Sequence, residues 1–418
     1  MTIPPINWID SPPHWAWLDT QSTALLDFYQ RGAPDFDNGG FWWVDDAGVP
    51  LKSHGKQLWI NARLTYAFSI GMLLGRPGFE PLVRHGIEFL ERGALRDHEN
   101  GGWFWALDDD NNPSDDSKQS YGHAFVLLAA SSAIIAGIDA RALFEDALDT
   151  LLTKFWDEDE SMFTDRWNRD FTELESYRGQ NANMHLVEAL MTAAEVTGDQ
   201  SLIQKAVGIA ERLIKGAAAE NDWCLPEHFR PGWVADLDYN RDDPDNLFRP
   251  YGYTIGHWLE WSRLLIQLSA APGAEIPWAR DASRKLFDRA ISEGWDSEQT
   301  GFAFSTDRQG NVLNHDRYHW VIAEAIGAAV ALYRGTGDSV YARWYVIFWE
   351  HAERFLINPI DRSWVHQLDG YNAPISDAWD GKPDLYHALQ ATLFARVPSG
   401  ASMVTNLAGG SLGRNSHA

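Results

Sequence analysis

Histidines recur near the starts of helical segments that are otherwise apolar. The stretch QNANMHLVEAL places Asn183 and His185 in the first turns of such a segment, and GHWLEW and DLYHALQ do the same with His257 and His387. A polar side chain buried without a partner costs a few kcal/mol, roughly 2 to 7. We therefore expect these side chains to face a shared polar pocket, where imidazoles with a pKa near neutrality can exchange protons reversibly.

Two of these histidines have an acid three residues further along. His185 is followed by Glu188, and His257 by Glu260. Residues at i and i+3 share a helix face, so each carboxylate could hold the tautomer of its histidine and raise its basicity. For His185 and Glu188, a purely structural hydrogen bond between helices remains an alternative.

A repeat along the chain indicates how these segments are arranged. Aromatic, Gly- and Asp-rich stretches such as NGGFWWVDDAG and NGGWFWALDDDNN recur at a spacing of roughly 55 to 75 residues, which is typical of repeat architectures. Several copies resemble short hairpins. Two helical segments lie between consecutive copies.

The two helices of each pair differ in pattern. The first is apolar nearly all round, as in 120–137, 183–196 and 319–333, which indicates a helix covered on both sides. The second carries one apolar stripe, as in 201–217. VTGDQS and GTGDSV stop one helix with Gly and cap the next with Asp or Ser.

About six such rounds fit the chain. The N-terminal helix (about 14–30) lacks a preceding partner and the last inner helix (382–396) lacks a following one, so pairing them closes a ring. The sequence predicts an all-α, single-domain (α/α)6 barrel over 1–398 with short β-hairpin loops at one end. An open solenoid is the competing layout. The Gly/Ser/Asn-rich segment 399–418 is predicted to be a flexible tail.

In such a barrel the first turns of the inner helices converge on one cavity. The residues predicted to lie there, besides those already named, are Lys56, Arg63, Tyr121, His123, Arg249, His319, Glu324 and Tyr386.

A metal site is the main rival interpretation of these histidines and acids. The sequence contains no HExxH motif and no Cys cluster, and the acid–histidine order is the reverse of the Glu-x-x-His of di-iron bundles. Glycine runs do not have phosphate-loop spacing. We therefore predict no metal and no other cofactor.

Composition narrows the class of partner. The net charge of −25 disfavours nucleic acid and anionic membranes, and no apolar run approaches the roughly 20 residues of a membrane span. The single cysteine, Cys224, and the absence of a signal-like start favour the cytoplasm. Twenty-one tryptophans are a weak indication of carbohydrate binding.

The sequence resembles the N-acylglucosamine 2-epimerase superfamily from about residue 14 to 398. The similarity is carried, in order, by KQLWINARLTYAFSIG, SYRGQNANMHLVEAL, PEHF, FRPYGYTIGHWLEWSRLL, VIAEAIGAAVALYRGTGD and AWDGKPDLYHAL. Within the superfamily the chain most resembles the aldose–ketose isomerases of mannose or sulfoquinovose. The resemblance implies an (α/α)6 barrel and proton transfer at C1 and C2 of a sugar by two histidines without an obligatory metal.

By match to these motifs, the resemblance implies that His257 and His387 are catalytic. It implies sugar-binding or supporting roles for Arg63, Asn183, His185, Arg249 and Glu324, and a stacking or wall role for Trp379. Tyr121, Glu260 and His319 complete the predicted substrate-binding set.

The predicted reaction is the interconversion of D-mannose and D-fructose through a cis-enediol, with D-lyxose and D-xylulose as a related pair. One histidine opens the sugar ring and the other moves the proton between C2 and C1; we favour His387 for the second task. Arg63 and Arg249 would stabilise the enediolate. A monosaccharide is the expected partner, and the protein is expected to be a monomer or a homodimer.

Several alternatives remain open. They are a sugar 2-epimerase of the N-acylglucosamine or cellobiose type, a sulfoquinovose isomerase, an inverting glycoside hydrolase that uses Glu260 and Glu324, and a non-catalytic binding protein.

Overall fold

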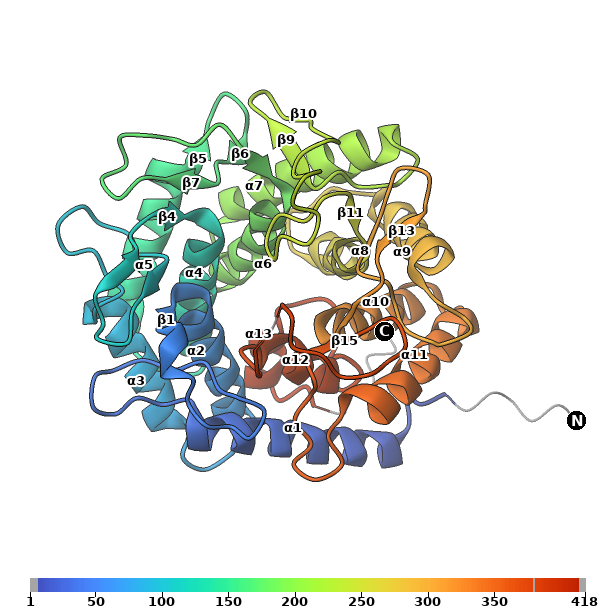
Figure 1. The fold of residues 1–418 in the computed structure, drawn as a ribbon, viewed down its shortest axis with the longest axis horizontal. Coiled ribbons are helices and arrows are strands. Elements are labelled where there is room, and N and C mark those ends of the chain that lie inside the picture. Colours follow the sequence, from blue (N-terminus) through green and yellow to red (C-terminus); the bar gives the residue numbers. More distant parts are fainter. Residues whose placement is uncertain (1–6, 379, 413–418) are drawn as a thin grey trace, which may run out of the picture.

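The inner helices of the molecule form a closed ring. The computed structural model describes residues 7–378 and 380–412, and each inner helix packs on the next until the last returns to the first (Figure 1). Almost every residue on these helices is buried, as the apolar pattern predicts. The inner helices are α2 (Leu58–Leu73), α4 (Ser120–Ile135), α6 (Gln180–Thr197), α8 (Ile255–Ala270), α10 (His319–Thr336) and α12 (Tyr386–Phe394).

An outer helix covers each inner one. Three outer helices continue into π-helical turns, η2 (Leu151–Phe155), η3 (Glu211–Ala218) and η4 (Ala352–Leu356). The outer helices are α1 (Pro12–Gly32), α3 (Phe79–Arg92), α5 (Arg141–Thr150), α7 (Gln200–Ala210), α9 (Ala279–Gly294) and α11 (Ser339–His351).

The predicted junctions between inner and outer helices are confirmed. Gly198 and Gly337 end α6 and α10 with φ of 74° and 71°, a conformation that glycine adopts without strain. The side chains of Asp199 and Asp338 then cap α7 and α11 by accepting backbone N–H bonds.

The two ends of the chain close the ring, as predicted. Helix α1 packs against α12, so the blue and red ends of the chain lie side by side in Figure 1. At the hairpin end, the backbone N–H of Lys382 donates to the carbonyl of Val44 at 2.8 Å. The described chain is therefore predominantly helical and of the α/α barrel type.

Short strands join consecutive rounds at one end of the barrel. A strand that leads into an inner helix pairs with a strand from the next hairpin along the chain, as β1 does with β2, β4 with β7, β8 with β9, β11 with β12 and β14 with β15. The strands are β1 (Lys56–Gln57), β2 (Ala106–Leu107), β3 (Pro113–Asp115), β4 (Lys118–Gln119), β5 (Trp156–Asp157), β6 (Met162–Phe163), β7 (Arg166–Trp167), β8 (Arg178–Gly179), β9 (His228–Arg230), β10 (Val234–Ala235), β11 (Tyr253–Thr254), β12 (Ser305–Thr306), β13 (Val312–Asn314), β14 (Arg317–Tyr318) and β15 (Gln367–Leu368).

Repeated ion pairs anchor the hairpins. In three rounds, a cation on the strand before an inner helix binds an aspartate 21 residues earlier: Lys56 with Asp35 at 2.7 Å, Lys118 with Asp97 at 2.9 Å and Arg317 with Asp296 at 2.9 Å. Lys56 was predicted to face the pocket; it is instead part of this repeated structural pair.

A second repeated contact corrects two further predictions. Asn61, His123 and Asn183 each accept the backbone N–H of a hairpin residue 20 positions earlier, at 2.7, 3.2 and 3.0 Å. All three side chains are buried and hold a hairpin against an inner helix. Asn183 and His123 therefore face the hairpin backbone, not the pocket.

Part of the segment predicted to be a flexible tail is a helix. Helix α13 (Met403–Ala408) packs against α2 and α4 and buries Met403, Val404 and Leu407. Glu195 accepts hydrogen bonds from the side chains of Ser402 and Thr405. The apolar side chains among the small polar residues explain the difference, and 413–418 lie outside the described residues. Among the described helices, none combines the length and apolarity needed to cross a membrane.

Candidate active site

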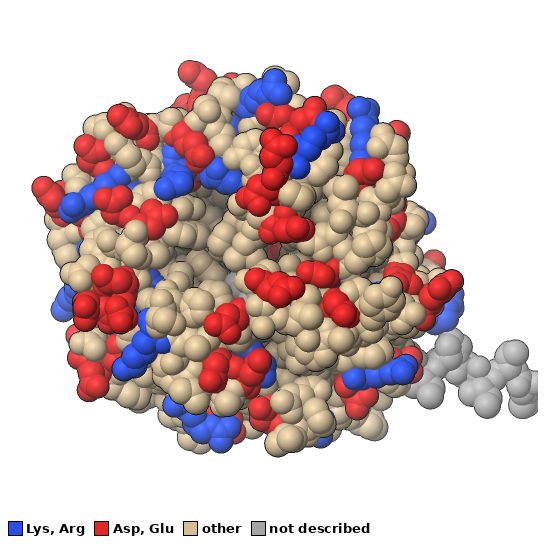
Figure 2. Space-filling model, viewed as in Figure 1, with Lys and Arg blue, Asp and Glu red and all other residues tan. Residues whose placement is uncertain are grey.

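The hairpin end of the barrel contains a cavity of about 710 Å³, its open mouth included. Figure 2 shows the hollow near the centre of this face. Seven predicted residues line it together: Arg63, Tyr121, His185, His257, Glu260, His319 and His387. The first turns of the inner helices therefore meet at one cavity, as the functional prediction requires.

His257 is held by an acid that the sequence argument did not assign to it. Its Nδ1 atom lies 2.8 Å from Oε2 of Glu227, a residue just before β9. Burial alone would raise the pKa of Glu227, but His257 and the amide of Gln180 outweigh this and lower the pKa. The predicted His257–Glu260 partnership is therefore wrong, because the tertiary fold supplies a better aligned carboxylate.

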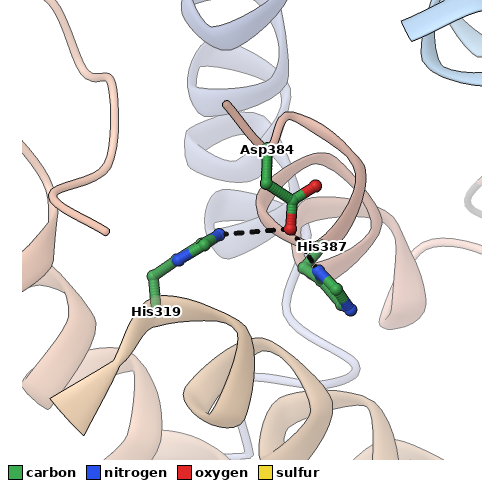
Figure 3. A group of neighbouring side chains, drawn as sticks. All are labelled: His319, Asp384 and His387. Atoms are coloured by element: carbon green, nitrogen blue, oxygen red, sulfur yellow. Dashed lines mark hydrogen bonds and ion pairs between the residues drawn. The ribbon is translucent and has the colours of Figure 1, made fainter. Parts of the chain in front are cut away.

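His387 has a carboxylate partner within its own helical turn. Oδ2 of Asp384 accepts a hydrogen bond from Nδ1 of His387, and Nε2 of His319 lies 3.4 Å from the same oxygen (Figure 3). Burial would raise the pKa of Asp384, but His387 and Arg63 hold it well below its ordinary value. Burial lowers the pKa of His387 although Asp384 opposes the shift. The Asp-x-x-His spacing in DLYH was a signal that could have identified Asp384.

One indole contacts both candidate catalytic histidines. The ring centroids of His257 and His387 lie 5.3 and 5.9 Å from that of Trp320, near the start of α10. Trp320, Trp59 and Phe248 provide the aromatic wall that we expected from Trp379, which lies outside the described residues. A flat apolar surface of this kind suits the face of a sugar.

A charged layer lies beneath the cavity. The Arg263 guanidinium lies 2.7 Å from Glu324, 3.5 Å from Glu260 and 3.8 Å from Glu188. Glu324 was predicted to bind substrate, but it supports this layer and does not line the cavity. Burial raises the pKa of Glu260 well above its ordinary value.

His185 does not pair with Glu188. Its Nδ1 lies 3.6 Å from Glu260, whereas Glu188 accepts a hydrogen bond from Tyr386. Burial lowers the pKa of His185 well below its ordinary value. His185 is therefore suited to binding a hydroxyl as a neutral ring.

The two predicted arginines have different places. Arg63 is buried in the cavity wall, donates to the Tyr121 hydroxyl at 2.8 Å and lies 3.7 Å from Asp384. Arg249 forms a two-bond pair with Glu175 at 2.8 and 2.9 Å and lines a shallower hollow outside the main cavity. Of these two arginines, only Arg63 lies where it could stabilise negative charge in the main cavity.

Three groups of side chains are close enough to share a cation, with ligand atoms within 4.8 Å of one another: His319, Asp384 and His387; His185, Glu188 and Glu260; and Glu260, Glu324 and His387. The carboxylates in each group already accept hydrogen bonds or face an arginine. A cation at Asp384 would lie close to the Arg63 guanidinium, which repels it. These histidine nitrogens and carboxylate oxygens therefore fit a hydrogen-bonded acid–base site better than a metal site.

The chain is similar to known proteins over most of its length. The family model for N-acylglucosamine 2-epimerase (GlcNAc 2-epimerase) matches residues 39–391. D-mannose isomerase from Thermobifida fusca is 41% identical over 404 residues, or 96% of this chain and 98% of the relative. D-mannose isomerase from Pseudomonas cannabina pv. alisalensis is 40% identical over 409 residues, 96% and 97% of the two chains.

Solved structures of similar proteins have the same fold. A crystal structure of D-mannose isomerase superposes with a TM-score of 0.86 at 30% identity, covering 94% of this chain and 99% of the other. Cellobiose 2-epimerase from Bacillus thermoamylovorans B4167 superposes with a TM-score of 0.79 at 19% identity, covering 91% and 98%, and shares the fold. The chain belongs to the N-acylglucosamine 2-epimerase family.

Proposed function

We propose that this chain is an aldose–ketose isomerase that interconverts D-mannose and D-fructose. The observation that carries the proposal is one cavity lined by two buried histidines, each with a carboxylate on Nδ1. The high identity to D-mannose isomerases supports the choice of substrate. D-Lyxose and D-xylulose are the proposed second pair.

The proposed chemistry moves one proton between neighbouring carbons. Nε2 of His387 removes the proton from C2 of the open-chain aldose, and the electrons form the C1–C2 double bond of a cis-enediol as O1 takes up a proton. Loss of the O2 proton then forms the C2 carbonyl while His387 returns its proton to C1. The lowered pKa of His387 supports this assignment, because a base must be neutral at working pH.

His257 is the proposed ring-opening group. A histidine whose Nδ1 is bound to a carboxylate can exchange a proton at Nε2 with the hemiacetal oxygens. Arg63 is the proposed stabiliser of the enediolate, because it is the arginine that lines the cavity. The neutral His185 and the buried His319 are proposed hydrogen-bond partners of sugar hydroxyls.

The charge at the mouth supports a neutral sugar over sulfoquinovose. Acidic side chains gather along the right-hand side of the hollow in Figure 2, and Asp245 lines the cavity. Asp245 and Asp316 bind neutral amides, those of Asn314 and Gln367. Burial and the neighbouring carboxylates of Asp377 and Asp245 raise the pKa of Asp316. A sulfonate or phosphate at this mouth would meet like charge.

Two other activities are separated by their products. A 2-epimerase would convert mannose to glucose, which requires a base at both faces of the intermediate. An inverting hydrolase needs two carboxylates about 6.5–9.5 Å apart with room for water, and here Glu260 and Glu324 both lie against Arg263. The isomerase is therefore favoured.

The decisive experiment follows mannose in D2O by proton NMR, with and without EDTA. We expect fructose in both samples, with deuterium entering at the exchanging carbon. Parallel samples contain lyxose, sulfoquinovose, cellobiose, N-acetylglucosamine and an aryl mannoside. No turnover of any aldose would contradict the proposal, glucose as main product would favour the epimerase, and free sugar from the aryl glycoside the hydrolase. Loss of activity with EDTA would favour a metal.

A variant test addresses the proposed base. We expect His387→Ala to lose turnover while its circular dichroism spectrum stays that of the parent. His98→Ala, which changes an exposed histidine in a turn after α3 that does not line the cavity, is the matched control. Normal activity of His387→Ala would remove His387 from the mechanism.

The fold detail, the location and the oligomeric state are also proposals. The pairing of each inner helix with an outer helix in the described chain supports an (α/α)6 barrel. We propose a cytoplasmic, metal-independent enzyme, in accord with its single buried cysteine. Sedimentation would distinguish a monomer from a homodimer.

A further inference from the structure

A short series of hydrogen bonds behind His257 determines which ring nitrogen faces the cavity. The indole N–H of Trp261 can only donate, and it lies 2.8 Å from the side-chain oxygen of Gln180. The NH2 of Gln180 is therefore directed toward Glu227, with Nε2 at 2.9 Å from Oε2. The backbone N–H of Thr254 donates to the other oxygen of Glu227 at 3.3 Å.

These donors decide where the proton on His257 resides. Glu227 accepts hydrogen bonds from Gln180 and Thr254, and its lowered pKa keeps it ionised, without a hydrogen to donate. Nδ1 of His257, 2.8 Å away, must therefore donate to it. Nε2 of Gln180 also lies 2.8 Å from Nδ1. If that amide donated to Nδ1, the lone pair of Nδ1 would face the lone pairs of Oε2 of Glu227 at 2.8 Å and repel them, so the Nδ1–H form is favoured. Nε2 of His257 then keeps its lone pair for the cavity.

We propose that Glu227, oriented by Gln180 and Trp261, is the positioning residue of His257. It holds the imidazole as the Nδ1–H tautomer with Nε2 toward the sugar, and it stabilises the positive charge that forms when Nε2 accepts a proton. The kinetic consequence rests on the proposed function, whereas the tautomer does not depend on it.

The kinetic test uses Glu227→Gln, which keeps the size of the side chain. The new amide can present its NH2 to Nδ1, which reverses the tautomer and leaves Nε2 unable to accept a proton. We expect kcat to fall by about 10³- to 10⁴-fold, the loss known for a reversed tautomer in a serine protease. KM should change only a few-fold, because Glu227 is not among the residues that line the cavity.

Three further variants complete the kinetic series. Glu227→Asp should recover part of the lost kcat, since it restores the charge at shorter reach. Trp261→Phe removes the donor that orients Gln180 and should lower kcat roughly tenfold. Glu195→Gln, the same chemical change at the opposite end beside Ser402, should retain the parent activity. A Glu227→Gln enzyme with kcat within tenfold of the parent would overturn the proposal.

Nitrogen-15 NMR of histidine-labelled protein reads the tautomer directly and needs no sugar. At pH 8 we expect His257 to carry its proton on Nδ1 in the parent and on Nε2 in Glu227→Gln. If Glu227→Gln does not fold, Trp261→Phe should show a mixture. A proton on Nε2 in the parent would overturn this inference even in an active isomerase. The Nδ1–H tautomer in a protein that turns over no aldose would instead overturn the proposed function alone.

Discussion

Asp384 lies one helical turn before His387, and its Oδ2 accepts the hydrogen bond of the Nδ1–H of that histidine. The pair is buried, and Asp384 also faces Arg63 at 3.7 Å. This carboxylate therefore orients the proposed base and at the same time balances the nearest guanidinium.

Replacing Asp384 by Asn should remove most activity. An amide can turn its NH2 toward Nδ1 and so reverse the tautomer of His387, and we expect kcat to fall by about 10³- to 10⁴-fold. Steady-state kinetics on mannose and circular dichroism are the measurements. Asp109→Asn, on an exposed hairpin loop, is the control and should be unchanged. Activity within tenfold of the parent would show that Asp384 does not orient the base.

The pH dependence of kcat should report the lowered pKa of His387. Burial favours the neutral imidazole, so its pKa lies below the ordinary value of 6.5. The base works only when neutral, so activity is lost as pH falls through that lowered pKa. We therefore expect the acid limb of a kcat profile from pH 4.5 to 9 to have its midpoint below 6.5. A midpoint at or above pH 7 would exclude His387 as the titrating base.

Neutralising the mouth should improve the use of anionic sugars. In Asp245→Asn/Asp316→Asn, we expect kcat/KM for sulfoquinovose or mannose 6-phosphate to rise roughly tenfold at low salt, because two like charges are removed. The value for mannose should stay within a few-fold. The control is Glu88→Gln/Glu145→Gln, which removes two exposed acids from the outer helices. It tests whether total charge alone changes kcat/KM for the anionic sugars. Equal gains in both double variants would contradict a local effect.

Removing Arg263 should destabilise the protein. Arg263→Met leaves Glu188, Glu260 and Glu324 buried without their guanidinium, and losing one partner of a buried ion pair costs about 3–5 kcal/mol. Urea unfolding measures the loss.

The same variant has a pH signature. Burial raises the pKa of both Glu188 and Glu260, so the folded state binds protons that the unfolded state has released. Stability of the variant should therefore fall as pH rises from 5 to 8. Arg84→Met, which breaks the exposed pair with Glu80, should cost at most about 1 kcal/mol. If Arg263→Met also lost no more than about 1 kcal/mol in its free energy of unfolding, the charged layer would not stabilise the fold.

Local patterns were sufficient to predict the framework. Apolar helices, one-sided helices and Gly–Asp junctions each follow from short-range periodicity, and the capping by Asp199 and Asp338 is decided within a few residues. The tail was mispredicted over α13, because composition does not show that Val404 and Leu407 have a surface to cover.

Partner choice could not be predicted in the same way. The i, i+3 spacing suggested Glu260 for His257, but Glu227 lies 30 residues away in sequence and reaches Nδ1. Asn183 and His185 are separated by one residue, yet Asn183 binds the backbone of Phe163 and His185 lines the cavity. A helix start predicts that a side chain is near the pocket, not which way it points.

The sequence by itself determined the ring of paired helices and the set of inner-helix starts that meet at one end, because both depend on periodicity along the chain. Only the tertiary structure decided which acid binds each histidine, that Arg249 and Glu324 are held by other charges, and that Trp320 lies against both imidazoles. Those contacts join segments far apart in sequence, and the distances that select one partner over another exist only once the ring is closed.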